Sequence, residues 1–240
     1  RVAGWALVVL AAFLIVYAAG ADYFPGFLNA PAESWDRLSV YMYLDGNALF
    51  GFPLTVTVSM IIAFILFGRM LYAVNGAEVL TDFAMAAMGR FRGGPAKVAV
   101  LASSFFGTIS GSAVANVLMD GPITIPMMRK AGYPGHLAAA TEAVASTGGQ
   151  IMPPVMGITA FIMAEFLAVP YGDVVLAALL PAILYYIALF TQVDLEAGRY
   201  NMAPLPRDML PQLRKVLGRG LVFIIPIFLL IWTLMVERWQ

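Results

Sequence analysis

The chain has 240 residues, of which 61% are hydrophobic and 12% are charged, and its formal net charge is zero. Soluble domains carry about a quarter charged residues, so these charges are too few to cover a water-exposed surface of this size. The charge balance gives no electrostatic basis for nucleic-acid binding, the absence of cysteine excludes thiolate chemistry, and the single histidine, His136, excludes a multi-histidine zinc site. We therefore predict an all-α polytopic membrane protein, whose apolar side chains face lipid.

Four apolar stretches are predicted to cross the membrane: 3–20, 48–73, 174–193 and 220–236. Each is close to the ~20 residues that a helix needs to cross a hydrocarbon core of ~30 Å. The chain starts at Arg1 and ends just after an apolar stretch, so we expect a piece of a longer polypeptide. The first stretch has no small-residue cleavage site, which argues against a cleaved signal peptide.

Polar segments separate these spans. Residues 21–47 are rich in proline, aromatic and acidic residues, and 77–91 are weakly amphipathic, which favours a helix lying along the membrane interface. Residues 200–217 hold three prolines and several cations and are predicted to be a polar connection. Lysine and arginine counts favour a topology in which 98–128 returns to its own side and 136–168 crosses the membrane. In that topology 200–217 is cytoplasmic and 21–47 is outside. A topology in which 98–118 crosses and 136–168 returns is less favoured but stays open.

Residues 98–128 are predicted to form a re-entrant hairpin. Its centre, 107–116, reads GTISGSAVAN, and glycine and serine are poor at holding a helix interior. About twelve residues precede the Ser110-Gly111 pair in this centre, which is about 18 Å of helix and just over half of the hydrocarbon core. The backbone freed at such a tip has to be buried in protein or to line a wet cavity.

Residues 136–168 are predicted to form a broken helix, since the run is too long for one straight span. The interruption is expected at 146–150, STGGQ, followed by Pro153 and Pro154, and it lies at about the same depth as the tip of the hairpin. Two interruptions at one depth indicate one binding site, in which helix N-termini favour anions and unwound carbonyls favour Na⁺. The alternative is that these small residues only allow close helix packing, and that Asn116 makes a structural hydrogen bond.

Four stretches together resemble a known family: 89–97 (GRFRGGPAK), 107–116, 145–157 (ASTGGQIMPPVMG) and 161–165 (FIMAE). They are similar to the large membrane subunit of the tripartite ATP-independent periplasmic (TRAP) transporters, in the fused-permease variant that works with a TAXI-type binding protein. The resemblance implies a sodium-coupled importer of small organic acids with an elevator-type ion-transporter-superfamily fold, built from two inverted repeats. This chain would hold the first repeat and the opening span of the second.

The resemblance also implies a division of the chain. Residues 1–75 would be scaffold helices, 76–97 an interfacial arm helix and linker, and 98–193 the mobile transport domain with the hairpin, the broken helix and a helix at 174–193. Residues 194–240 would be a cytoplasmic connection and the first scaffold helix of the second repeat. The implied partners are a periplasmic TAXI-type binding protein, a small membrane subunit or an N-terminal fusion to it, membrane lipid and a small organic acid. The implied location is a bacterial or archaeal inner membrane.

The resemblance assigns residues to two sites. The sodium site would comprise Ser110, Gly111, Asn116, Thr147 and Gly149, and the substrate would be bordered by Ser112, Gln150, Met152 and Pro153. No organic cofactor is implied.

Two positions depart from the family pattern. Met119 and Asp120 stand where the family has a small hydroxyl pair, and Asp194 stands where it often has histidine. Asp120 and Glu142 are carboxylates within predicted membrane segments, which are functional candidates by default, so both are accessory candidates.

Other functions remain as rivals. A channel or an ion-coupled exchanger could use the same broken helices, although the spans lack the continuous polar lining of a channel. An intramembrane enzyme would have to pair Ser110 or Ser112 with His136, which is a poor arrangement, so no enzyme activity is expected. A protein that served only as a structural anchor would not need helices that are interrupted at the membrane midplane.

Overall fold

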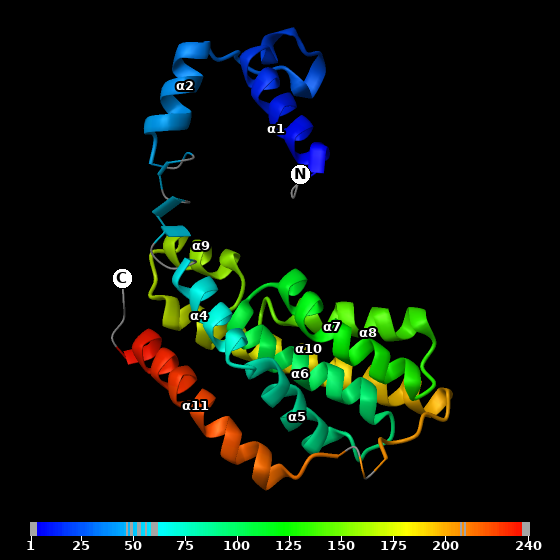
Figure 1. The fold of residues 1–240 in the computed structure, drawn as a ribbon. Coiled ribbons are helices and arrows are strands. Elements are labelled where there is room, and N and C mark those ends of the chain that lie inside the picture. Colours follow the sequence, from blue (N-terminus) through cyan, green and yellow to red (C-terminus); the bar gives the residue numbers. More distant parts are fainter. Residues whose placement is uncertain are drawn as a thin grey trace. The chain divides into compact units, whose positions relative to one another are not determined.

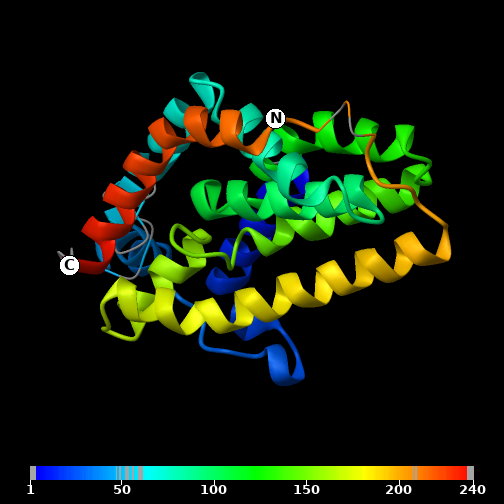
Figure 2. The same ribbon diagram turned by 90° about the horizontal axis from the view of Figure 1, so that it is seen from below.

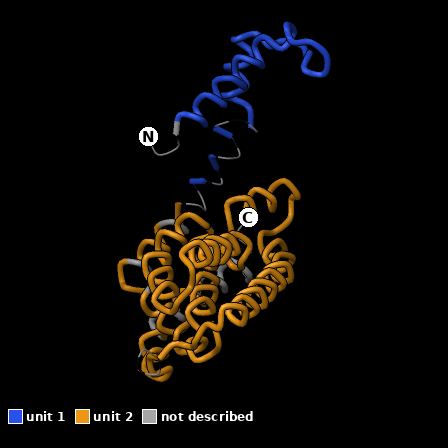
Figure 3. Tube along the Cα trace, turned by 90° about the vertical axis from the view of Figure 1, so that its right-hand side faces the viewer, with its two compact units in different colours: residues 1–59 blue, residues 60–240 orange. Residues whose placement is uncertain are grey.

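The computed structural model describes residues 4–46, 48, 50–51, 54–55, 57–58, 62–206, 208 and 210–236. These residues form helices joined by turns and irregular segments, with no strand among them. The helical prediction is therefore confirmed for the described residues, although much of the predicted span 48–73 lies outside them. Two compact units divide the chain at residues 1–59 and 60–240 (Figure 3).

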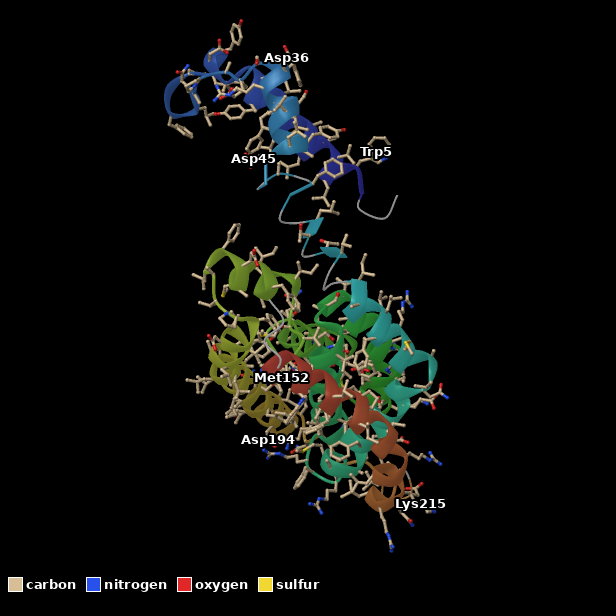
Figure 4. The ribbon with its side chains drawn as sticks, turned by 90° about the vertical axis from the view of Figure 1, so that its left-hand side faces the viewer. Trp5, Asp36, Asp45, Met152, Asp194 and Lys215 are labelled. Atoms are coloured by element: carbon tan, nitrogen blue, oxygen red, sulfur yellow. The ribbon has the colours of Figure 1, made fainter. Side chains whose placement is uncertain are left out.

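Unit 1 contains α1 (Gly4–Ala19) and α2 (Trp35–Leu44), joined by two short 3-10 turns, η1 (Ala21–Tyr23) and η2 (Gly26–Leu28). The apolar side chains of α1 are largely exposed, as Figure 4 illustrates at Trp5, which is 83% exposed. Tyr17 donates to the carbonyl of Leu28 at 2.6 Å and ties the connection to α1. Ser34 caps α2 by accepting from the amide of Arg37 at 3.3 Å. An exposed apolar helix of this kind suits a lipid or protein neighbour.

Unit 2 contains eight of the described helices. In chain order they are α4 (Ile62–Ala73), α5 (Gly76–Met88), α6 (Gly94–Ser110), α7 (Ala113–Lys130), α8 (Gly135–Gly148), α9 (Ile158–Phe166), α10 (Tyr171–Arg199) and α11 (Leu213–Val236). Helix α6 is central, since it packs against α4, α5, α7, α8 and α10 (Figure 1). Helix α11 packs on α5, and α9 packs on α10 (Figure 2).

Helix α10 runs as one long rod of 29 residues (Figure 2). Among the described residues it is the helix that is long and apolar enough to cross a membrane by length and composition. It contains the predicted span 174–193, just as α11 contains 220–236, α1 corresponds to 3–20, and α5 corresponds to the amphipathic stretch 77–91. The predicted division into scaffold and transport domains stays a prediction.

The core between α6, α8 and α10 combines alanines with larger side chains such as Met128 and Tyr186. Fully buried alanines line each of these helices, among them Ala99, Ala145 and Ala197. Small residues allow helix backbones to approach closely, which is how membrane helices gain contact energy without a hydrophobic driving force. The ends of α6 and α8 also approach one another closely, at Gly107 and Gly149, and it is there that both helices are interrupted.

Candidate functional site

The hairpin α6–α7 turns at two residues, Gly111 and Ser112. Gly111 has φ of +57°, a left-handed conformation that glycine adopts readily, and a Cβ there would overlap the carbonyl oxygen of Met156. Ser112 is the N-cap of α7 and accepts from the amide of Ala115 at 3.3 Å. The side chain of Ser110 in turn accepts from the amide of Ser112 at 3.4 Å. The predicted interruption within 107–116 is therefore present, as a tight turn between two helices.

The second interruption separates α8 from α9 and covers residues 149–157. Some of its backbone groups form hydrogen bonds within the segment. The amide of Gly157, for example, donates to the carbonyl of Gln150 at 2.7 Å. The hydroxyl of Tyr171, at the start of α10, lies 2.9 Å from the carbonyl of Pro154 and 2.8 Å from that of Val155. The predicted break within 136–168 is present: it begins inside the STGGQ string, at Gly149, and continues through the two prolines.

The two interruptions meet. The amide of Val155 donates to the carbonyl of Thr108 at 3.3 Å, which joins the second break to the last turn of α6. Gly107 lies so close to Gly149 that a Cβ on either would overlap the backbone of the other. The turn between α6 and α7 and the break between α8 and α9 are therefore in direct backbone contact.

A cavity of about 710 Å³ lies beside this meeting point. Its polar lining comes from both interruptions and from α4 and α9, and consists of Ser110, Ser112, Gln150, Thr159 and Arg69. Apolar side chains such as Phe106, Leu118, Met119 and Phe161 make up most of the rest. A mainly apolar cavity with a few convergent polar groups is the usual form of a small-molecule site.

Comparison with known proteins identifies the family. The family described as the DctM component of the tripartite ATP-independent periplasmic transporter matches residues 1–237. The chain belongs to this family. The resemblance of its motifs to the large TRAP membrane subunit is thereby confirmed.

Three relatives illustrate the match. An uncharacterized protein, YgiK of Salmonella typhimurium, is 31% identical over 188 residues, or 78% of this chain and 41% of that protein. The C4-dicarboxylate TRAP transporter large permease protein DctM of Pseudomonas aeruginosa is 32% identical over 166 residues, or 68% of this chain and 38% of that protein. The 2,3-diketo-L-gulonate TRAP transporter large permease protein YiaN of Escherichia coli is 28% identical over 153 residues, covering 64% and 35%. The chain spans about two fifths of the length of such relatives.

Within this DctM-family chain, the structure brings some of the predicted sodium residues together. Asn116 is fully buried, and its amide nitrogen would lie 3.3 Å from a Cβ on Gly149. The oxygen of the same amide is buried without a hydrogen-bond partner, and such an oxygen suits a hard cation such as Na⁺. Ser110 and Gly111 lie at the turn and line the cavity. Thr147 is exposed and donates to the carbonyl of Ala143 within α8 at 2.8 Å, so the structure does not bring its hydroxyl to the others.

Of the four predicted substrate residues, two line the cavity and two do not. Ser112 and Gln150 line the cavity. Met152, labelled in Figure 4, packs against the buried cluster between α6, α8 and α10. Pro153 is half-buried and is joined to Pro154 by a cis peptide bond. Among the described groups of side chains, no three His, Asp or Glu residues come together in a way that could hold a metal ion.

The sequence prediction missed a buried polar cluster beside the site. Asp120 and Glu142, named above as accessory candidates, come together there with the side chains of Ser103, Thr124 and Ser146, and all five are fully buried. One signal was available, because Asn116, Asp120 and Thr124 follow one another at four-residue spacing and so share one face of α7. The partners on α6 and α8 could not be read from that spacing.

Asp194 joins the 89–97 motif to the end of α10. Asp194, labelled in Figure 4, accepts from Lys97 at 2.6 Å and from the guanidinium of Arg92, which also donates to the backbone carbonyl of Asp194 at 3.2 Å. Tyr133, in the connection between α7 and α8, lies nearby and donates to the carbonyl of Gly93 at 3.4 Å. Burial, together with the negative charge of Asp194, raises the pKa of Tyr133 to about 12. Two cations of the 89–97 motif therefore bind Asp194 and link the start of α6 to the C-terminal part of α10.

Proposed function

We propose that this chain is part of the large permease of a sodium-coupled importer of small organic acids. The permease is multi-pass in a bacterial or archaeal inner membrane, and it receives its substrate from a periplasmic binding protein of the TAXI type. A small membrane subunit, separate or fused N-terminally, completes the complex. The chain supplies the first of two inverted repeats, with α6–α7 as a re-entrant hairpin in an elevator-like transport domain.

The observation that supports the sodium site is the meeting of two interrupted helices around a buried, unpaired amide oxygen. The carbonyl of Thr108 is joined to the second break, Gly107 touches Gly149, and Asn116 Oδ1 has no partner. Broken helices with free oxygens at one depth are how secondary transporters bind coupling ions. Sodium bound there would stabilise the contact between the two breaks and so complete the neighbouring cavity.

The lining of the cavity supports an organic acid as the substrate. Ser112 at the N-terminus of α7 and Arg69 on α4 both line it, and a helix N-terminus and a guanidinium each favour a carboxylate. Apolar side chains make up most of the remaining lining, which suits the carbon skeleton of the acid. Relatives carry names that refer to C4-dicarboxylates and to 2,3-diketo-L-gulonate, both of which are acids.

The direct test is uptake into proteoliposomes that contain the complete permease and its binding protein. We expect uptake of the bound acid to require an inward sodium gradient and to cease when choline replaces sodium. Uptake that is equal with and without the sodium gradient would contradict the coupling. Passive flux without the binding protein, at a rate that does not saturate with substrate, would favour a channel instead.

A further inference from the structure

The buried cluster beside the site is built around two carboxylates. Ser103 Oγ on α6 lies 3.4 Å from Asp120 Oδ2 and 3.3 Å from Glu142 Oε1, so one hydroxyl bridges the acids of α7 and α8. Thr124 Oγ1 lies 2.5 Å from Glu142 Oε2, and Ser146 Oγ lies 3.2 Å from Glu142 Oε1. Both carboxylates are fully buried.

The hydrogen-bond donors in this cluster do not suffice for two ionised acids. Ser103, Thr124 and Ser146 have one hydroxyl hydrogen each, and all three lie beside Glu142. Asp120 is left with at most the shared hydrogen of Ser103, and its Oδ1 has no partner. A buried carboxylate oxygen without a donor is costly in the ionised state, so the deficit is at Asp120.

Positive charge is also lacking. The ion pairs found among the described residues involve neither Asp120 nor Glu142, and the charged group that shares the Ser103 hydroxyl with Asp120 is Glu142 itself. On α6, α7 and α8 themselves, the other charged or titratable groups lie at least about 7.5 Å along the helix from the nearest cluster residue: Lys97, Arg129, Lys130 and His136. The packed helices α4, α5 and α10 carry seven more, and no ion pair among the described residues joins any of them to Asp120 or Glu142: Arg69, Glu78, Asp82, Asp173, Asp194, Glu196 and Arg199.

Asn116 does not supply the missing donor to Asp120. Asn116 stands one turn before Asp120 on α7, is fully buried, and donates through Nδ2 to the carbonyl of Ser103 at 2.9 Å. Its Oδ1 has no partner. Two acceptor oxygens on one face of α7, both near Ser103, are therefore buried without a donor.

We propose that Asp120 and Glu142 form a proton-binding carboxyl pair that holds one proton, carried by Asp120. Two like charges that share a buried site cannot both be ionised, so one acid retains its proton. Glu142 is the better anion because three hydroxyls lie beside it, even though the hydrogen of Ser103 is shared with Asp120 Oδ2 and that of Thr124 with the carbonyl of Asp120. Asp120 is the better acid because the shared hydrogen of Ser103 is all that its carboxyl group receives. A proton needs no coordination shell, and neither residue lines the cavity. The inference does not depend on the proposed sodium coupling.

The test is an infrared spectrum of the complete purified permease in a detergent without ester groups. A protonated carboxylic acid gives a carbonyl stretching band that shifts in D₂O and is distinct from the band of a carboxylate. We expect this band in the wild type near neutral pH, with and without sodium. The substitution Asp120→Asn should abolish it, since Glu142 is then ionised among its hydroxyls, whereas Glu142→Gln should keep a shifted band because Asp120 still lacks donors.

The matched control is Glu165→Gln, which removes an exposed carboxyl on α9 and should leave the band unchanged. If Asp120→Asn does not give a folded, monodisperse protein, Asp120→Ser serves in its place, since it restores a small hydroxyl at this position. A band that survives removal of Asp120 would overturn the proposal. A band that is absent in sodium and develops when sodium is removed would also overturn it, and would show that the pair binds a metal cation.

Discussion

The substitution Gly107→Ala tests the contact between the two interruptions. A Cβ at this position meets the backbone of Gly149, and backbone cannot rotate away as a side chain can. Overpacking of this kind costs about 1–3 kcal/mol, while alanine in place of glycine inside a helix returns up to about 1 kcal/mol. Because the clash is with backbone, the cost lies at about 2–3 kcal/mol of that range, so the net loss is about 1–2 kcal/mol, which lowers the population of the joined state about five- to thirtyfold.

Sodium-driven uptake and thermal unfolding of the complete permease measure this effect together. We expect Gly107→Ala to lower the unfolding temperature and to raise the sodium concentration for half-maximal uptake. Gly218→Ala on α11 is the matched control, because Gly218 is also helical but a Cβ there meets no atom within 4 Å, so it should be neutral or slightly stabilising. If Gly107→Ala behaves like Gly218→Ala, the close approach of the two breaks does not exist in the working protein.

Three further predictions follow from single contacts. Tyr171→Phe removes the hydroxyl beside the carbonyls of Pro154 and Val155 and should destabilise the protein by about 1 kcal/mol, measured by thermal unfolding; an unchanged midpoint would contradict it. Arg69→Gln should raise the KM for uptake more than it lowers the maximal rate, because the cation lines the cavity without joining the two breaks; an unchanged KM would remove Arg69 from substrate binding. Asp194→Asn should lower the unfolding temperature at low salt and less so at high salt, since the lost contacts are with two cations; an effect independent of salt would argue for packing instead.

The sequence predicted the helix breaks because their causes are local. The Gly-Ser turn at 111–112 and the Gly-Gly and Pro-Pro pairs at 148–154 disturb helix geometry wherever they occur in a chain, and the structure breaks there. Length and hydropathy likewise located 174–193 within α10 and 220–236 within α11. These features need no knowledge of which helices touch.

The buried carboxylate cluster could not be predicted in the same way. Ser103, Asp120 and Glu142 come from three helices, and their meeting depends on how α6, α7 and α8 rotate about their axes. Sequence spacing fixes which residues share a face of one helix, but not which face of the next helix it meets. For the same reason, the motif did not show which way the Thr147 hydroxyl points, and in the structure it is exposed on α8.

Sodium binding by the purified complete permease tests the central claim most directly. Calorimetric titration with sodium chloride, against choline chloride as the blank, should give saturable binding to the wild type. Asn116→Ala removes the unpaired amide oxygen and should weaken that binding at least tenfold while the protein stays monodisperse. Equal sodium affinity in the wild type and in Asn116→Ala, or no saturable binding to the wild type at all, would contradict the account.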